Sequence, residues 1–368
     1  MYIRMPSVDH LIKTTKKLVQ TANIVIGLQS KHSIVFCMTK YVNVLENNKL
    51  FKFSFAHASI AAIILLLSSS VTAQQMSFLK KENNEQVTFF YQWSDLQKQS
   101  RTFSFSLDKA LVFEKYRGFR QYKPELTQQY VNRAIVKHIR KNPLPNVDLS
   151  VRKQGNQYQL QLRSNNNDAL NNAQIKLREL EQQFSAQYLQ KNYYHFFQTP
   201  DGETAIKPNH VRIALESAED LKPLKHIVLD SVSIKNIRKV TNYVLGFVQS
   251  IPYETLENRV TSSGAGFNPP LKLLWENKGD CDSKVTLTAA LLRMLMPRIR
   301  IALIFIDGHA LIGLGMPAIN GEFSIVHDNI SFVLAEPTGP TLLPLGKVAN
   351  DSEQAILSGY YVVEELTN

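Results

Sequence analysis

Cysteine is nearly absent from this sequence of 368 residues, which contains only Cys37 and Cys281. Cys37 lies in a leader that we expect to be removed, so the mature chain would keep one thiol. A single cysteine excludes an intramolecular disulfide and a zinc site built from several thiolates. A lone thiol is more often a small buried side chain than a nucleophile. A catalytic role for Cys281 must therefore be argued from the residues around it.

The sequence also lacks a long run of Lys and Arg interleaved with aromatic residues. Its formal net charge is +11, and +6 of this comes from residues 1–73, where eight Lys and Arg stand against Asp9 and Glu46. The surplus of +5 over residues 74–368 favours a mildly basic solvated surface, and we expect no nucleic-acid partner. Hydrophobic residues make up 44% of the chain, enough to bury a sizeable core, which argues against disorder for its bulk.

Phosphate-binding and metal-binding patterns are missing as well. The glycines of the string GLGMP (Gly313–Pro317) are followed neither by Lys-Ser/Thr nor by a helix. The residues His309, His327, Asp328 and Glu336 could be imagined as metal ligands, but their spacing matches no standard zinc motif. We therefore expect no metal and no cofactor.

An apolar run, Phe53–Leu67, follows two lysines and precedes the polar string SSSVTAQQ. Val71 and Ala73 supply the small residues of an A-x-A-like cleavage site, and cleavage after Ala73 would start the mature chain at Gln74. These features predict a secretory signal peptide within a leader of residues 1–73. We therefore expect an exported protein, either periplasmic or secreted.

Two alternatives concern this leader. If residues 53–71 are not cleaved off, they are just long enough to anchor the chain in a membrane. The signal also lies far from Met1, and a translation start at Met38 would explain that distance. We expect contact with a membrane only through an uncleaved leader.

Residues 74 to about 220 are predicted to form a smaller α+β module. The strings VTFFYQW and TFSFSL alternate between apolar and polar residues, as half-buried strands do. Pro124–Lys141 has apolar residues at helical spacing behind an initial proline. Gly155 and Asn156 separate the strands of a hairpin, and a long polar helix is expected near residues 168–193. The module contains no cluster of His, Cys and Asp, so its role is undefined: packing, recognition or autoinhibition.

Residues 230–368 are predicted to form a second domain. We expect an amphipathic helix at Ser233–Ser250 and a continuous apolar helix that follows the string GDCDS and stops at Pro297. The strings IRIALIFID, HALIGLGMP, GEFSIVHD and SFVLAEPTG then indicate successive strands. A buried helix followed by an antiparallel sheet is an α+β architecture.

Cys281 lies at a predicted helix N-terminus. Gly279 and Asp280 interrupt the chain before it, and the apolar helix starts directly after it. Unpaired backbone N–H groups and the positive end of the helix dipole favour a thiolate there. The same N–H groups can hold an oxyanion. This position suits a nucleophile, whereas a structural cysteine has no need of it.

A thiol nucleophile needs an imidazole base and a group that orients the imidazole. His309 stands 28 residues after Cys281, behind Gly308 and at the start of an apolar strand. Glu336 stands 27 residues further on, at the end of the next-but-one apolar strand. A helix N-terminus and two strands can bring these three side chains together.

Three strings occur in a recognisable order over roughly residues 240–345: GDC before an apolar helix, HA opening a strand, and an acid–Pro–Thr string closing another. In these strings the chain resembles the transglutaminase-like superfamily, which includes eukaryotic transglutaminases, peptide N-glycanases and bacterial cysteine proteases. The resemblance implies a papain-like or transglutaminase-like core, with a nucleophile helix packed on an antiparallel sheet. It also implies that Cys281 is the nucleophile, His309 the general base and acid, and Glu336 the orienting acid.

The sequence departs from the superfamily at the third of these positions, which is usually Asp. Glu336 is one methylene longer and can still reach an imidazole, as Glu does in some serine hydrolases. Asp328 is the competing acid, but its turn-like HDN string lacks the Pro-Thr context. His327 is the competing base, although nothing in the superfamily pattern requires it.

The resemblance further implies a second oxyanion donor from a side chain upstream of the nucleophile. Trp275 and Gln249 are the candidates, and Trp275 can equally be a core or groove aromatic. Asp280 and Asp282 flank the nucleophile and are candidates for binding a substrate amine or amide. The alternative for both is helix N-capping.

The expected activity is acyl transfer from a peptide or amide bond through a Cys281 thioester. With water as the acceptor the protein is a peptidase or amidase, which export favours by analogy with exported bacterial members of the superfamily. With an amine acceptor it is a protein-crosslinking transglutaminase. The expected partner is a protein or peptide substrate in the cell envelope. A non-catalytic binding or scaffolding module is the alternative from another class, and the sequence leaves the oligomeric state open.

Overall fold

The structure is a computed structural model that describes residues 3–4, 74–154, 157–258 and 266–367. These residues belong to one compact unit. The leader expected at residues 1–73 lies outside them, except for one short strand at Ile3–Arg4. Within the described residues, no helix is both long and apolar enough to cross a membrane.

The architecture is α+β, as predicted, and the strands of every described sheet pair in antiparallel fashion. The strands are β1 (Ile3–Arg4), β2 (Gln74–Glu82), β3 (Gln86–Ser94), β4 (Ser100–Asp108), β5 (Asp148–Gln154), β6 (Gln157–Arg163), β7 (Tyr194–Gln198), β8 (Thr204–Pro208), β9 (Ile301–Ile306), β10 (His309–Gly315), β11 (Ser324–His327), β12 (Ile330–Ala335) and β13 (Val362–Glu365). The helices are α3 (Lys109–Glu114), α4 (Pro124–Lys141), α5 (Asn167–Lys191), α6 (His210–Asp220), α7 (Leu224–Ser231), α8 (Ile237–Ser250), α9 (Pro270–Glu276), α10 (Cys281–Leu295) and α11 (Asn350–Leu357).

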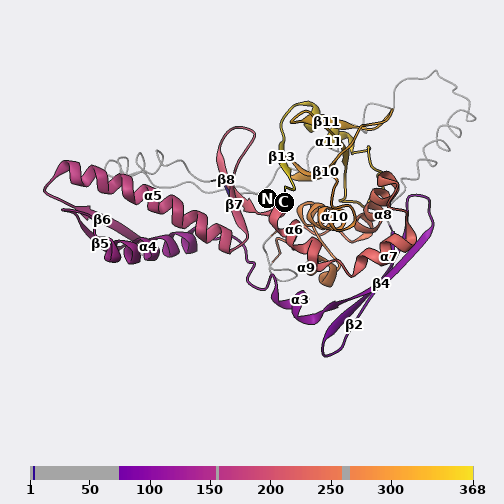
Figure 1. The fold of residues 1–368 in the computed structure, drawn as a ribbon, viewed down its shortest axis with the longest axis horizontal. Helices are drawn as coiled ribbons and strands as arrows, with labels where there is room; N and C mark the ends of the chain where they lie inside the picture. The colour runs from indigo at the N-terminus through magenta and orange to yellow at the C-terminus, as the bar shows by residue number, and fades with distance from the viewer. Residues whose placement is uncertain (1–2, 5–73, 155–156, 259–265, 368) are drawn as a thin grey trace, which may run out of the picture. The chain divides into compact units, whose positions relative to one another are not determined.

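The strands β2, β3 and β4 form a three-stranded antiparallel sheet (Figure 1). Alternate residues of β3 are buried, and Val87, Phe89, Tyr91 and Trp93 are at most 1% exposed. This alternation confirms the strands predicted from the strings VTFFYQW and TFSFSL. The buried face packs on α8, where the Phe247 ring contacts the rings of Tyr91 and Trp93.

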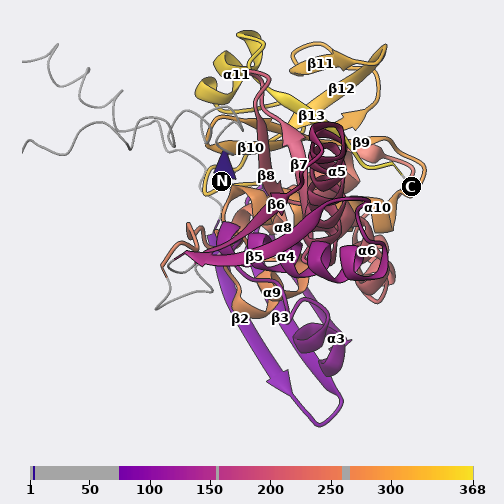
Figure 2. The same cartoon turned by 90° about the vertical axis from the view of Figure 1, so that its left-hand side faces the viewer.

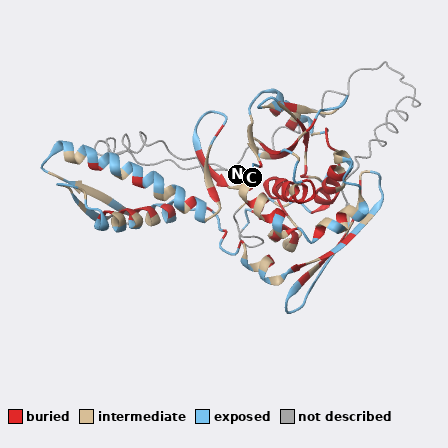
Figure 3. Ribbon diagram, viewed as in Figure 1, coloured by how far each residue is buried: buried red, intermediate tan, exposed pale blue. Residues whose placement is uncertain are grey.

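A second sheet has five strands in the order β11-β12-β10-β9-β13, and these strands also gather together in Figure 2. One face of β10 packs through Ala310, Ile312 and Leu314 into the core that contains α10. Leu311 points to the other face, where it belongs to a cluster with Ile356 of α11. The helix α10 is buried along nearly its whole length (Figure 3). A buried helix packed on an antiparallel sheet therefore carries Cys281.

Both sheets contribute to one hydrophobic core, so the core does not divide near residue 220, where we expected a domain boundary. The Tyr91 hydroxyl in β3 donates a hydrogen bond to the backbone oxygen of Leu274 in α9 (2.9 Å). The helix α6 packs along α10. The aromatic face of β3 is too apolar to be left without a partner, and α8 and α9 supply that partner.

A separate small core holds together the segment Pro124–Lys191, called here the 124–191 module. It consists of α4, the β5–β6 hairpin and α5, in the places where a helix, a hairpin and a long polar helix were predicted. Val131, Ile135 and Ile139 lie four residues apart along α4 and pack in a cluster with Leu180 of α5. Their spacing places them on one side of the helix and leaves its opposite side to solvent.

Candidate active site

A cavity of about 370 Å³ lies beside the N-terminus of α10. Its lining includes Cys281 and His309, together with Gly308 and with Phe305 of β9. Cys281 is 8% exposed, and the His309 side chain is 22% exposed. The expected nucleophile and the expected base therefore line the same space.

Cys281 is the first residue of α10 because Asp280 caps the helix. The Asp280 carboxylate accepts a hydrogen bond from the backbone N–H of Ser283 (3.0 Å) and another from the Ser283 hydroxyl. Before the cap, a Cβ on Gly279 would lie 2.8 Å from Cδ1 of Leu273, so a larger residue there would force the Leu273 side chain to shift. Asp280 thus caps the helix, as in the alternative considered for it, and also lines the cavity.

The sulfur of Cys281 lies 3.6 Å from Oδ1 of Asp282 and 3.8 Å from the backbone oxygen of Gly308. Burial raises the pKa of the Cys281 thiol well above its usual range, and the carboxylates of Asp282 and Asp280 raise this pKa further. We expected the helix N-terminus to favour a thiolate, and the structure instead favours a protonated thiol. Desolvation and two acidic neighbours act against the helix dipole.

His309 is hydrogen-bonded to Glu336, as predicted from their order in the sequence. Nε2 of the imidazole lies 2.8 Å from Oε1 of the carboxylate. This contact engages Nε2, and Nδ1 has no hydrogen bond to any residue that the structure describes. Nδ1 is therefore the ring nitrogen left for a proton transfer, although no hydrogen bond joins it to the Cys281 sulfur among the described residues.

The start of α11 holds the second oxygen of Glu336. Oε2 accepts a hydrogen bond from the backbone N–H of Ala349 (2.8 Å) and lies 3.3 Å from the Ser352 hydroxyl. Burial tends to raise the pKa of Glu336, but the hydrogen bonds from His309 and Ala349 outweigh it and lower the pKa below its ordinary value. The carboxylate therefore stays ionised and fixed in orientation.

The competing pair, His327 and Asp328, does not line the cavity. The two residues lie at the end of β11, and the Asp328 side chain is 77% exposed. The structure thus brings Cys281, His309 and Glu336 to one site and leaves the competitors outside it.

Neither side chain expected as an oxyanion donor lines the cavity. Nε2 of Gln249 donates hydrogen bonds to the backbone oxygens of Glu336 and Leu343, both at 2.9 Å, so both of its N–H bonds are engaged. The ring of Trp275 packs against Phe113 and lies 3.6 Å below the Lys80 ammonium. Trp275 is thus an aromatic of the core edge, and Gln249 supports the chain after β12.

The same chain segment explains the glycine of the string EPTGP. Gly339 has a φ of +64°, and a Cβ there would lie 2.3 Å from the backbone oxygen of Gln249. A side chain would therefore both strain the backbone and push this segment away from α8. The position of Glu336 thus depends on contacts that begin beyond it in the sequence.

Lys284 is a residue of the site that the sequence analysis missed. It lies on α10 one turn after Cys281 and is completely buried. Its ammonium donates hydrogen bonds of 2.5 Å to the backbone oxygens of Ile251 and Thr338. Burial lowers the pKa of Lys284 to about 7. The sequence did contain an indication of this role. A lysine one turn into a continuous apolar helix must be buried, and a buried ammonium needs hydrogen-bond acceptors.

A second set of buried polar groups lies behind Cys281. His210 is fully buried on α6, with Nδ1 3.2 Å from the Thr286 hydroxyl and Nε2 3.8 Å from Oδ2 of Asp282. Burial lowers the pKa of His210 to about 3, so its ring is neutral. On the cavity wall, the buried Lys207 ammonium lies 2.9 Å from Oε1 of Glu364. Asp282 therefore lies between Cys281 and His210. Neither substrate binding nor helix capping, the two roles considered for it, includes this contact with His210.

Two groups among the described residues bring three possible metal ligands within reach of one another. One is Asp280, Cys281 and Asp282, and the other is His327, Asp328 and Glu365. Each group has one carboxylate that is already engaged. Asp280 caps α10, and Glu365 forms an ion pair with Arg300, the residue just before β9.

The comparisons with known proteins identify no relative: no family model, no curated protein and no solved structure matches the chain.

Proposed function

We propose that this protein is a cysteine-dependent acyl transferase that hydrolyses peptide or amide bonds through a Cys281 thioester. The observation that carries the proposal is the hydrogen bond of 2.8 Å between His309 and Glu336, beside the cavity that Cys281 also lines. The order of the three residues in the sequence resembles that of transglutaminase-like cysteine proteases, and this resemblance adds support.

In the proposed reaction, Nδ1 of His309 takes the thiol proton while the Cys281 sulfur attacks the substrate carbonyl. The backbone N–H of Cys281, in the first turn of α10, has no intrahelical acceptor and can donate to the oxyanion. The intermediate collapses when the amine leaves with the proton from His309. His309 then takes a proton from water, the hydroxide attacks the thioester, and the carboxylic acid leaves as the sulfur regains its proton.

The raised pKa of the thiol fits this order of events. A protonated thiol is a weak nucleophile, so the reaction depends on His309 as a general base at the moment of attack. Glu336 stabilises the imidazolium that forms and holds the ring through its hydrogen bond to Nε2.

Labelling of Cys281 by iodoacetamide at mildly acidic pH tests the proposal. We expect His309→Ala to slow alkylation strongly, whereas His327→Ala, a matched change outside the cavity, leaves the rate unchanged. Cys281→Ala provides the unlabelled background. Equal labelling rates in the wild type and in His309→Ala would show that His309 does not act as the base for Cys281.

Two alternatives have an observation of their own. The carboxylates of Asp280 and Asp282 at the cavity suit a substrate amine, which favours a crosslinking transglutaminase. Isopeptide products, detected by mass spectrometry with a labelled primary amine, would show that reaction in place of hydrolysis. Among the described residues the Cys281 sulfur makes no hydrogen bond to His309, which favours a non-catalytic binding module, and an inert thiol in both the wild type and His309→Ala would support it.

We also propose export through the leader, with cleavage after Ala73. Mass spectrometry of the mature N-terminus tests this step. A terminal peptide that begins at Gln74 is the expected result. Recovery of peptides from residues 1–37 in the mature protein would overturn this cleavage and would also exclude a translation start at Met38.

A further inference from the structure

The positive charge of the exported part is concentrated in the 124–191 module. Between Pro124 and Lys191 the sequence has ten Lys and Arg against five Asp and Glu. Residues 74–123 and 192–368 together contain 24 of each kind. The whole surplus of +5 beyond residue 73 therefore belongs to the module, and the rest of the exported part is neutral.

A groove of about 550 Å³ on the module gathers four of these cations. It runs between α4 and β5, and its lining contains no acidic residue. We call it the basic groove and define it by its lining: Gln129, Asn132, Arg133, Val136, Lys137, Arg140, Lys141 and Val151.

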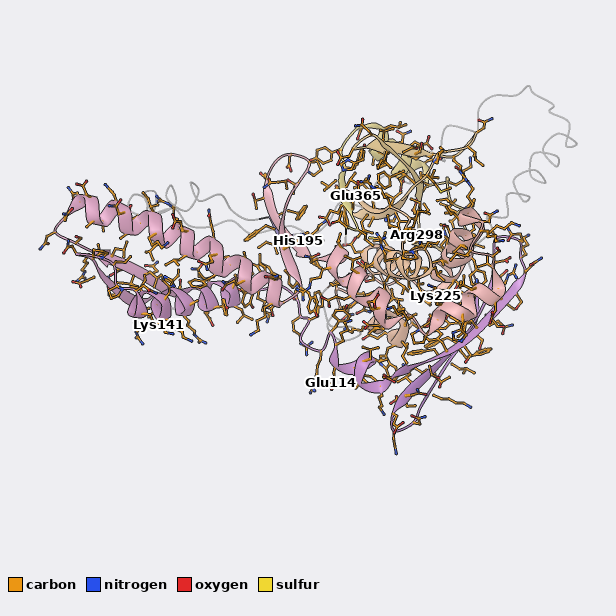
Figure 4. All side chains as sticks on the ribbon, in the orientation of Figure 1. Glu114, Lys141, His195, Lys225, Arg298 and Glu365 are labelled. Carbon is orange, nitrogen blue, oxygen red and sulfur yellow. The ribbon has the colours of Figure 1, made fainter. Side chains whose placement is uncertain are left out.

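The four cations lie on the solvent side of α4, opposite its buried stripe, and Figure 4 labels Lys141 there. From Arg133 to Lys141 they span about 12 Å of helix, at 1.5 Å per residue. None of the four forms an ion pair with a residue that the structure describes. By contrast, Lys176 on α5 pairs with Glu179 (2.9 Å). Like charges three and four residues apart repel one another on a helix, so an anionic partner would relieve a strain built into α4.

The strand β5 offers a second recognition element in the same groove. It pairs with β6 and with no other strand of the described structure, so the backbone N–H and C=O groups of its outer edge have no strand partner. Val151 of β5 lines the groove and is 47% exposed. An extended peptide can add to such an edge and place alternate side chains to the two sides.

We propose that the basic groove binds an extended acidic segment of a protein partner. The segment would pair with the free edge of β5, and every second side chain, an Asp or Glu, would face the cations of α4. No aromatic residue lines the groove, so it offers no stacking platform for single-stranded nucleic acid. A sheet edge contributes nothing to the binding of an anionic lipid surface. The proposal concerns the 124–191 module alone and does not depend on the chemistry at Cys281.

Fluorescence anisotropy with the full exported chain tests the proposal. The probe is a labelled peptide of the length of β5 in which Glu alternates with Thr. We expect Arg133→Gln/Lys137→Gln/Arg140→Gln to weaken binding on the order of tenfold, since each exposed charge contributes modestly. The matched control is Lys176→Gln/Arg178→Gln/Lys191→Gln, which removes the same charge from α5 outside the groove and should change affinity less than about twofold. Equal losses in the two triple variants would show non-specific attraction and overturn the site.

Two further probes separate strand pairing from charge alone. The same peptide with alternate backbone amides methylated keeps its carboxylates but cannot complete the pairing with β5, and we expect it to bind on the order of tenfold more weakly. Unchanged affinity would overturn the strand pairing. Single-stranded DNA and vesicles of phosphatidylglycerol serve as competitors. The unlabelled peptide is the reference competitor, and concentrations are compared per anionic group. If DNA or the vesicles displace the labelled peptide at a lower concentration than this reference, the assignment to a protein partner is overturned.

Discussion

Charged side chains near Cys281 and charged side chains of the 124–191 module are used in opposite ways. Lys284 and Glu336 are buried or nearly so, and each is held by two or more hydrogen bonds. Arg133 and Lys137 are exposed, without an ion-pair partner among the described residues. A buried charge stabilises a geometry because its loss leaves partners unsatisfied, whereas an exposed charge mainly determines what approaches the surface.

This difference predicts two scales of response. Substitutions of the buried charged residues near Cys281 (the buried set) should change activity or folding strongly, and each should affect more than one chain segment. Substitutions of the exposed charged residues of the 124–191 module (the exposed set) should leave folding unchanged and alter binding only. The following predictions test the comparison, from the largest expected effect to the smallest.

Replacing Cys281, the proposed nucleophile, has the largest expected effect. Cys281→Ala should reduce the proposed acyl transfer by roughly 10⁴-fold or more, because residues 74–368 contain no other thiol. A proteomic comparison of envelope proteins between wild type and Cys281→Ala measures this as the loss of specific cleavage products. Circular dichroism should show an unchanged fold. Unchanged products would end the proposal of a Cys281 thioester.

Removing the charge of Glu336, the proposed orienting acid, comes next. Glu336→Gln should slow acyl transfer by roughly 10²–10⁴-fold, because the imidazolium loses its counter-charge and the ring its fixed orientation. The rate of Cys281 alkylation measures the effect. Glu353→Gln, an acid on the neighbouring helix α11, is the matched control. Similar rates in the two variants would contradict the role of Glu336.

Lys284→Met tests the buried lysine as a structural tie. The substitution leaves the buried backbone oxygens of Ile251 and Thr338 without donors, which should lower the free energy of unfolding by about 2–4 kcal/mol. Urea denaturation measures the change. A value near zero would show that water or the backbone replaces the ammonium without loss.

Asp280 should make stability depend on pH. Burial, and then Asp282, raise its pKa in the folded protein from 3.8 to about 7, so the folded state binds more protons than the unfolded state between these values. Its contribution to stability is therefore fully present below about pH 4 and is lost as the pH rises towards 7. Asp280→Asn should remove this decline, which can reach about 1.4 kcal/mol per pH unit. Denaturation curves at several pH values measure it, and identical slopes in both proteins would contradict the shift.

The smallest effect is expected in the exposed set. Lys176→Met breaks the surface pair with Glu179, whose side chains are 50% and 58% exposed. The free energy of unfolding should change by less than about 0.5 kcal/mol. The same urea titration used for Lys284→Met measures it. A loss as large as that of Lys284→Met would erase the distinction between the two sets.

Patterns local to the chain were sufficient to predict much of the fold. Pro124 and the Asn142-Pro143 pair delimit α4 because proline suits the first turn of a helix and disfavours the helical conformation of the residue before it. Alternation predicted β3 and β4, and the strands around the site followed their apolar strings. The contact between His309 and Glu336 was predicted from the order of their strings and from the superfamily resemblance that these strings carry. The elements that were missed, such as α11 and β13, are short and carry weak periodicity.

The remaining features of the site come from tertiary packing. The pKa of Cys281 is raised because the thiol is buried beside Asp282, which in turn lies against His210 of α6, more than 70 residues earlier in the chain. Gln249 turns to Glu336 and Leu343 because the segment after β12 returns to α8. No periodicity in the sequence encodes such contacts.

The anchoring of Glu336 by α11 has a consequence for dissecting the protein. A fragment that stops at residue 345, where the sequence resemblance ends, would keep Cys281, His309 and Glu336. It would lose the N–H of Ala349 and the hydroxyl of Ser352, and with them the support of one carboxylate oxygen. The smallest autonomous piece is therefore longer than the stretch that contains the reacting groups, and truncation experiments should set their limit beyond α11.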